Sequence, residues 1–196
     1  MSKLRNALCE RLGLKVPIFG FSHSIDVTVA LANAGGFPFY GAAWDLPEVI
    51  TKKMRTIRER VGDRPFGINL MLPTSVGEET SREAVAASLP QQHKDFVAGL
   101  REKYAVPAAT RPTFFSSQVR SQQLFAEQID AALQSSANAL ASAIGTTAHT
   151  VARAKAAGKL TISLVGSPKH AHSVKAAGVD LIVAQGHDAA GHTGPR

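Results

Sequence analysis

The chain alternates between short apolar runs and longer segments in which apolar positions recur at helical spacing. Apolar runs that are rich in β-branched and aromatic residues predict buried strands. Six such runs are present, at residues 16–21, 37–41, 66–70, 139–145, 160–166 and 180–184. Because these runs are continuously apolar, we expect the strands to be parallel and covered by other structure on both faces.

Amphipathic segments fill most of the connections between these runs and predict helices at residues 27–33, 46–61, 149–157 and 168–177. Asp26 is placed to cap the first helix, and Gly158 and Gly178 are placed to end the last two. The segments that end in Ala156-Ala157-Gly158 and Ala176-Ala177-Gly178 are near repeats of one helix-then-strand unit. A unit that repeats at about 20–25 residues is typical of parallel βα folds.

The region at about 71–137 does not follow this rhythm. It predicts helices at 81–88, 91–104 and 118–133, separated by irregular stretches. We interpret residues 1–196 as one partial (β/α) barrel domain with an irregular insertion at about 71–137. A long βα connection is where a barrel enzyme builds cover for its substrate.

Composition limits the remaining possibilities. The 196 residues, 44% of them hydrophobic and 19% charged, are enough for one core. They are few for an eight-stranded barrel, for which about 250 residues is typical. No apolar run is long enough to span a membrane, and the first residues have no apolar signal-peptide region. The single cysteine, Cys9, excludes an intramolecular disulfide and favours a cytoplasmic location.

The formal net charge of +7 raises the possibility of a nucleic-acid partner. The densest basic cluster, at residues 52–60, alternates with apolar positions at helical spacing, and no aromatic residue lies between its charges. We interpret it as a solvated helix face and expect no nucleic-acid binding. We also expect no metal site, because His170 and His172 would point different ways on a helix and no cysteine or acidic cluster completes a ligand set.

The strongest candidate site is the loop at residues 184–194, directly after the sixth predicted strand. It has three glycines, two histidines, one carboxylate and no bulky apolar residue, so it is unsuited to a core. Glycines let a backbone turn tightly and approach a ligand closely. The carboxyl ends of parallel strands are where α/β folds place their chemistry. An imidazole such as that of His192 can act as a base or carry charge at neutral pH.

The loop Ala184-Gln185-Gly186-x-Asp188-Ala189-Ala190-Gly191-His192-x-Gly194 resembles the A-Q-G-x-E-A-G-G-H-x-G signature of the nitronate monooxygenase (2-nitropropane dioxygenase) family. It departs at Asp188 and Ala190, where Glu and Gly are usual. Residues 66–70 resemble the family's F-G-V-N-L, and Pro17-Ile18 and Gly35-Gly36 match its opening motifs. The family's Pro-Met pair is replaced here by Ser22-His23.

This resemblance implies an FMN-dependent TIM barrel that oxidises alkyl nitronates with O2 to a carbonyl compound and nitrite. It implies that His192 is the catalytic base or an anion-stabilising group. The flavin contacts that we expect on this basis are Asn69, Gln185, Gly186, Gly191, Gly166, Phe21 and Ser22. Gly166 also opens a helix, whose first N–H groups can bind an anion.

Only six of the eight strands of a barrel are present, and the family's later A-A-G-G-I and L-G-A-x-x-V-x-x-G-T segments are absent. We therefore interpret the sequence as a fragment, a truncated gene product, or a form that needs a partner such as a second copy. Two alternative functions stay open: an NAD(P)H-dependent flavin reductase of the enoyl-acyl-carrier-protein reductase type, which has a similar G-G-H loop, and a non-catalytic barrel fragment. We expect the isolated chain to bind FMN weakly or not at all.

Overall fold

The computed structural model describes residues 5–73, 81–111, 119–143 and 145–189. The chain forms two compact units, one made of residues 1–74 and 126–196 and the other of residues 75–125. The first unit contains one parallel sheet of six strands in the order of the chain. The strands are β1 (Phe19–Ser22), β2 (Phe37–Gly41), β3 (Gly67–Leu70), β4 (Ala139–Ser142), β5 (Leu160–Val165) and β6 (Leu181–Ala184).

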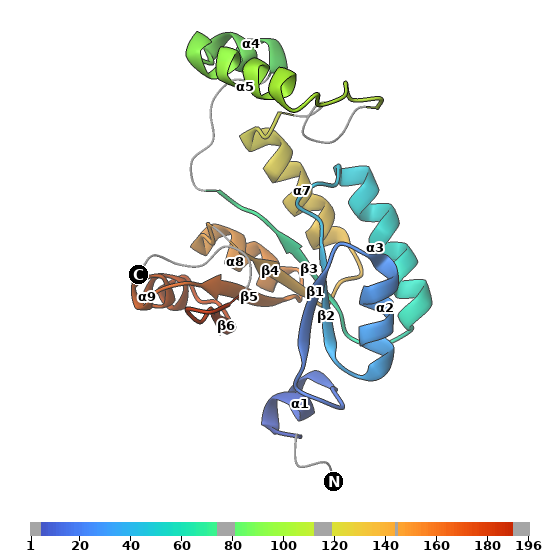
Figure 1. The fold of residues 1–196 in the computed structure, drawn as a ribbon. Coiled ribbons are helices and arrows are strands. Elements are labelled where there is room, and N and C mark those ends of the chain that lie inside the picture. Colours follow the sequence, from blue (N-terminus) through green and yellow to red (C-terminus); the bar gives the residue numbers. More distant parts are fainter. Residues whose placement is uncertain (1–4, 74–80, 112–118, 144, 190–196) are drawn as a thin grey trace. The chain divides into compact units, whose positions relative to one another are not determined.

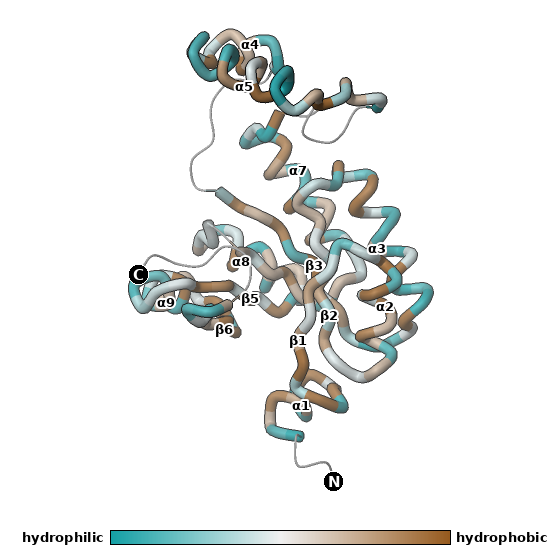
Figure 2. Tube along the Cα trace, viewed as in Figure 1, coloured by the Kyte–Doolittle hydropathy of each residue, from teal (hydrophilic) through white to brown (hydrophobic). Residues whose placement is uncertain are grey.

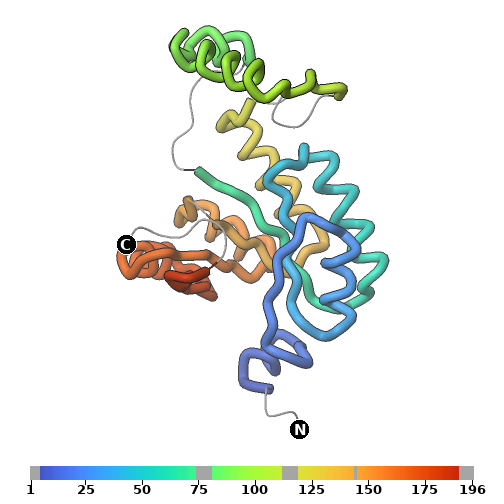
Figure 3. Tube along the Cα trace, in the orientation of Figure 1, coloured from blue at the N-terminus to red at the C-terminus, as the bar shows by residue number. Residues whose placement is uncertain are grey.

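Every strand pairs in parallel with the strand before it, so the chain steps across the sheet in one direction from β1 to β6, as the colours of Figure 3 show. A doubly wound sheet would instead reverse its strand order at a switch point. The uninterrupted order and the intervening helices confirm the predicted fold class, an incomplete TIM-type barrel with six of its eight strands.

Five helices of this unit follow strands: α2 (Ile25–Ala34), α3 (Pro47–Val61), α7 (Gln122–Gln134), α8 (Ala148–Ala156) and α9 (Pro168–Ala176). Helices α2 and α3 lie side by side against the sheet (Figure 1). The predicted cap of α2 is wrong. Ser24 is the N-cap and its side chain accepts a hydrogen bond from the Val27 N–H. Asp26 lies in the first turn, where its carboxylate pairs with Arg60 instead.

Side chains alternate between two apolar layers along the strands. On β2, Phe37 and Phe39 belong to the layer inside the curled sheet, and Tyr40 belongs to the layer between the sheet and the helices. The second layer is filled by the apolar stripe of α3, including the fully buried Ile50 and Ile57. The expected cover on both faces is found for β2, β3 and β4, which are buried along their whole length. It is wrong for the edge strands β1 and β6, which carry apolar residues (Figure 2) but are partly exposed.

A helix that the sequence pattern did not predict, α1 (Ala7–Leu12), precedes the sheet. Asn6 caps its start, and Gly13 ends it with a left-handed φ of 68°. With six residues, the helix is too short to show an apolar period. Its buried Cys9 packs in the inner layer with Phe37 and Phe39, so α1 contributes to the core near the N-terminal end of β1 (Figure 1).

Polar side chains are firmly bonded at the N-terminal edge of the sheet. Lys159, which precedes β5 and is 6% exposed, donates to the carbonyl oxygens of Ser135 and Ala137 at 2.8 and 2.7 Å. Burial lowers the pKa of the Lys159 ammonium, and the Arg58 cation lowers it further. Arg58 itself donates to the Ser136 carbonyl and to the Asn138 side chain. These bonds tie the end of α7 to the start of β4 and β5.

The second unit contains two of the predicted helices, α4 (Arg82–Ser88) and α5 (Gln91–Lys103). All described residues from 81 to 111 are exposed. The third helix expected in this region begins at Gln122, four residues later than predicted. Among the described residues, no helix is both long enough and apolar enough to cross a membrane.

Candidate functional site

Because all six strands are parallel, their C-terminal ends lie along one edge of the sheet, which places several expected site residues there. Asn69 is on β3, Phe21 and Ser22 are on β1, and Gly166 directly follows β5. Gln185 and Gly186 directly follow β6. The remaining two, Gly191 and His192, lie outside the described residues, so the predicted catalytic imidazole has no described position.

Asn69 is the buried polar side chain of this edge. It is 7% exposed, and no described residue forms a hydrogen bond with its carboxamide. Its backbone is fully used, because the Asn69 carbonyl accepts from the Ala42 N–H at 2.9 Å. Asn69 thus presents, at the C-terminal edge of the sheet, a carboxamide that no described residue bonds and that is available to a ligand.

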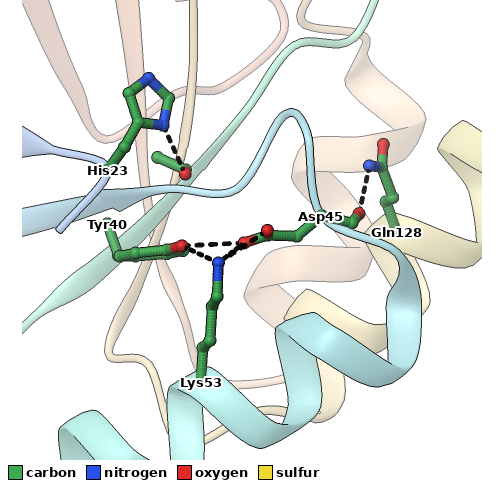
Figure 4. Close-up of polar contacts among 6 residues, drawn as sticks. His23, Tyr40, Asp45, Lys53 and Gln128 are labelled. Atoms are coloured by element: carbon green, nitrogen blue, oxygen red, sulfur yellow. Dashed lines mark hydrogen bonds and ion pairs between the residues drawn. The ribbon is translucent and has the colours of Figure 1, made fainter. Parts of the chain in front are cut away.

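His23, which replaces the methionine expected in the first loop, has a defined orientation (Figure 4). Its Nδ1 lies 2.8 Å from the carbonyl oxygen of Gly41 on β2. The last paired residues of β1 and β2 are Ser22 and Tyr40, so Gly41 lies one position beyond the ladder. The His23 ring thus supplies to the Gly41 carbonyl the hydrogen bond that a backbone N–H would supply if the β1–β2 ladder continued. Its edge also meets the ring of Phe21, with centroids 5.0 Å apart and planes at 83°.

Gly41 provides the space for these two rings. A Cβ atom at this position would lie 2.5 Å from Phe21 Cζ and 2.7 Å from His23 Cε1. Both distances are far below a normal van der Waals contact, and both neighbours are rigid aromatic rings. The glycine is therefore required for the observed positions of Phe21 and His23. Phe21 itself is 58% exposed at the end of β1.

A second polar cluster, made of Tyr40, Asp45 and Lys53, anchors the loop between β2 and α3 (Figure 4). Lys53 Nζ lies 2.7 Å from Asp45 Oδ1 and donates to the Tyr40 hydroxyl, which donates to Asp45 Oδ2 at 2.9 Å. Gln128 of α7 donates to the Asp45 carbonyl at 2.8 Å. The cluster holds the loop whose Ala42 bonds to Asn69.

The ionisation of this cluster follows from its contacts. Burial raises the pKa of Tyr40, and the Asp45 carboxylate raises it further against the opposing effect of Lys53. Burial acts to lower the pKa of Lys53, but its bonds to Asp45 and Tyr40 outweigh burial and raise it. The sequence interpretation of residues 52–60 as a solvated face is thus wrong for Lys53, whose bonds to Asp45 and Tyr40 are partly buried. Lys52 and Arg55 are exposed, and the bonds of Arg58 to Ser136 and Asn138 are exposed as well.

Side chains in the turns after β4 and β5 form hydrogen bonds within the protein. The Thr146 hydroxyl bonds to the hydroxyls of Ser142 and Ser163, the latter at 2.9 Å. It therefore joins the ends of the two strands. Ser167, next to Gly166, caps α9 by accepting from the His170 N–H. Both turns have clear structural roles. His170 and His172 lie on α9, and among the described residues no three histidine, cysteine or acidic side chains gather as a metal site would require.

The described part of the edge fits a cofactor with polar groups. Asn69 offers a buried carboxamide with unused hydrogen-bonding capacity, and an added Cβ at Gly186 would meet no atom within 4 Å. The surroundings of Gly186 are therefore open among the described residues, as they are at Gly62 and Gly158. These two features lie at the ends of β3 and β6, on the same edge as His23.

Comparison with known proteins supports the sequence resemblance. Residues 14–196 match the family model of nitronate monooxygenase. A Mycobacterium tuberculosis protein named as a candidate monooxygenase is 35% identical over 199 residues, which cover 97% of this chain and 53% of that protein. A nitronate monooxygenase from Paraburkholderia phytofirmans is 32% identical, covering 97% of this chain and 50% of that protein. The chain thus spans about half the length of the curated relatives it matches.

Solved structures share the fold. A nitroalkane oxidase from Streptomyces ansochromogenes superposes with a TM-score of 0.70 at 22% identity, covering 96% of this chain and 51% of that chain. An enoyl reductase domain from the macrolactin biosynthesis cluster of Bacillus amyloliquefaciens gives a TM-score of 0.56 at 16% identity, covering 88% and 34%. At these identities the similarity establishes the architecture and leaves the reaction to be argued from the site.

Proposed function

The chain belongs to the nitronate monooxygenase family, and on that premise we propose that it forms part of a flavin enzyme that oxidises alkyl nitronates with O2. The products would be a carbonyl compound and nitrite. The observation that carries this proposal beyond family membership is the buried carboxamide of Asn69, which lies on the catalytic edge without a described partner. A carboxamide in this position can both donate to and accept from a bound ligand.

FMN is the cofactor that we propose for this edge. When bound, it would accept electrons from the nitronate. Asn69 would donate to or accept from the cofactor, and the backbone at Gln185 and Gly186 would let it approach closely. Gly166 of the β5 turn, and Phe21 and Ser22 of β1, complete the contacts proposed from the described residues, and Gly191 would contribute from the loop after β6. An exposed aromatic face such as that of Phe21 suits contact with a planar ring.

His192 remains the proposed catalytic imidazole. A nitronate is an anion, so an imidazole that can carry a positive charge or donate a hydrogen bond would hold it in place. We also propose a cytoplasmic location and pairing with a second copy of the chain.

Oxygen consumption and nitrite release measure this function directly. With saturating FMN and preformed propane-2-nitronate, we expect the chain to consume O2 and release nitrite without NAD(P)H. Replacing Asn69 with the near-isosteric leucine should weaken FMN binding by about 10- to 100-fold, because the carboxamide contacts are lost while the volume is kept. Titration of FMN fluorescence against wild-type and Asn69→Leu protein would measure this change.

Two other results would contradict the proposal in different ways. Oxidation of NAD(P)H in place of nitronate would support the enoyl reductase type of activity, whose representative from Bacillus amyloliquefaciens shares this fold. If the chain neither binds FMN nor turns over nitronate at millimolar FMN, the result would support a barrel fragment that is inactive alone. The expectation that the chain binds FMN weakly makes the saturating concentration essential to this test.

A further inference from the structure

The hydrogen bond between His23 and Gly41 fixes the tautomer of the imidazole. A backbone carbonyl oxygen can only accept, so at 2.8 Å the Nδ1 atom of His23 must carry the proton. In the neutral ring, Nε2 is then the unprotonated atom with a free lone pair. Figure 4 shows that Nε2 lies on the side of the ring away from Gly41. No described residue forms a hydrogen bond with it.

The ring is held in this position by the surrounding structure rather than by chance contact. The rings of Phe21 and His23 are nearly perpendicular, and a Cβ at Gly41 would collide with both. The next residue in the chain, Ser24, caps α2 and so fixes the backbone directly after His23. Rotation of the imidazole would sacrifice both the Gly41 bond and the aromatic contact. A base whose orientation is set in this way is suited to remove a proton from a bound molecule.

The position of His23 adds the second argument. It directly follows β1 at the C-terminal edge of the sheet, two strands from Asn69 on the same edge. This is the edge where barrels of this type place their catalytic groups. An imidazole that only capped the end of a ladder would serve equally well with its second nitrogen buried, whereas here that nitrogen is presented at the catalytic edge.

We propose that His23 is a second catalytic imidazole of this site, which acts as a general base through Nε2 on a neutral carbon acid. This inference rests on the proposed function and deepens it, because the conjugate acid of an alkyl nitronate is a nitroalkane. His23 would generate the nitronate within the site, and His192 would keep its proposed role of holding the nitronate anion.

The step balances in atoms and charge. Nε2 takes the proton from the carbon next to the nitro group, and the electron pair of that C–H bond moves to form the C=N bond of the nitronate as negative charge collects on its oxygens. His23 becomes an imidazolium whose Nδ1–H remains bonded to the Gly41 carbonyl. No oxidant is consumed, so this step proceeds in the absence of O2.

Exchange of the substrate's α-protons with solvent deuterium therefore tests the step separately from oxidation. The full chain with FMN is incubated under nitrogen with 2-nitropropane in D2O, and loss of the α-proton signal is followed by NMR. The wild-type chain should accelerate exchange above buffer. His23→Asn should slow this catalysed exchange by at least about 100-fold, because the amide can still donate to Gly41 but cannot accept the proton. His170→Asn, the same change at an exposed histidine of α9, should exchange at the wild-type rate.

His23→Ala gives a second test that a purely structural role would fail. If His23 is the base, added imidazole should restore exchange in this variant. Melting temperatures of both variants would show that they fold. Catalysed exchange that survives in His23→Asn, or a wild-type chain that does not exceed buffer, would overturn the inference. Oxidation of preformed nitronate by the wild-type chain tests the proposed function alone, so the two failures are distinguishable.

Discussion

The two edges of the parallel sheet treat their polar side chains differently. At the N-terminal edge, Lys159 donates to two carbonyls, and Asp180 accepts from both the backbone and the hydroxyl of Thr161. At the C-terminal edge, Asn69 is buried without a described partner, and Nε2 of His23 is likewise free among the described residues. Among the described residues, the side-chain groups left without a protein partner in this comparison are at the C-terminal edge, where Asn69 is buried and His23 is exposed.

The difference indicates that polar side chains at the N-terminal edge stabilise the fold, whereas those at the C-terminal edge are available for ligand binding. A buried polar group with all its partners fixes neighbouring segments, whereas a polar group that no described residue bonds is available to a ligand. Barrels of this type place catalytic residues at the C-terminal ends of the strands, whereas residues at the N-terminal ends serve mainly to stabilise the fold. The contrast therefore predicts which substitutions unfold the chain and which impair its ligand binding.

The largest loss of stability is expected at the N-terminal edge. Lys159→Met keeps the length of the side chain but removes the ammonium, which leaves the Ser135 and Ala137 carbonyls without their donor. We expect the free energy of unfolding to fall by about 3 kcal/mol. Urea denaturation measures the change, and Lys169→Met on the exposed face of α9 is the matched control. Equal midpoints for the two variants would contradict the structural role of Lys159.

An intermediate effect is expected for the cluster that anchors the β2–α3 loop. Asp45→Asn leaves the half-buried Lys53 ammonium without its carboxylate, although the amide oxygen can still accept from Tyr40. We expect a loss of about 1–2 kcal/mol in the free energy of unfolding. Asp26→Asn breaks the exposed pair with Arg60 and should cost less than about 1 kcal/mol. A larger effect for Asp26 would show that burial does not govern these pairs.

In contrast to the substitutions at Lys159 and Asp45, Asn69→Ala should change ligand affinity more than the free energy of unfolding. Because no described residue bonds to the carboxamide, its removal should alter the free energy of unfolding by no more than about 1 kcal/mol. FMN affinity should fall about tenfold, which corresponds to about 1.4 kcal/mol. Ser142→Ala, which removes a hydroxyl bonded to Thr146, should instead lower stability and leave FMN affinity unchanged. Calorimetric titration and urea denaturation together distinguish these outcomes.

The repeating part of the fold was predictable from sequence because each strand and helix carries its own local signal. Predicted strand 37–41 matches β2 at both ends, since the pairing of its continuous apolar run extends over its full length. Strand β4 stops at Ser142, before the predicted end at 145, because its ladder with β3 and β5 ends there. Pairing partners, which a single sequence does not reveal, set that boundary.

The polar clusters were harder to predict for the same reason. Asp45 and Lys53 are eight residues apart, with a turn between them, and no periodic pattern joins them to Tyr40. His23 was visible only as a departure from a family motif, and its bond to Gly41 depends on the register of β1 against β2. Asn69 was singled out as a proposed flavin contact because it is a strong polar residue within an apolar run that resembles the family's F-G-V-N-L, and both signals are local in the sequence.

The smallest expected effect concerns the pH dependence at Asp180. Burial acts to raise the pKa of this carboxyl, but hydrogen bonds from Thr161 and the nearby Lys155 outweigh burial and lower it below its ordinary value of 3.8. The folded state thus binds the proton less tightly than the unfolded state. The stability that Asp180 provides is fully present above the unfolded pKa and is lost as pH falls through the folded one.

Asp180→Asn, which can still accept from Thr161, should therefore be less stable than wild type by about 1 kcal/mol at pH 6, and this deficit should shrink as the pH falls below about 4. Urea midpoints at pH 6, 4 and 3 measure the deficit, with the exposed Glu59→Gln as control. A deficit that stayed constant down to pH 3 would mean that the contacts of Asp180 do not depend on its charge.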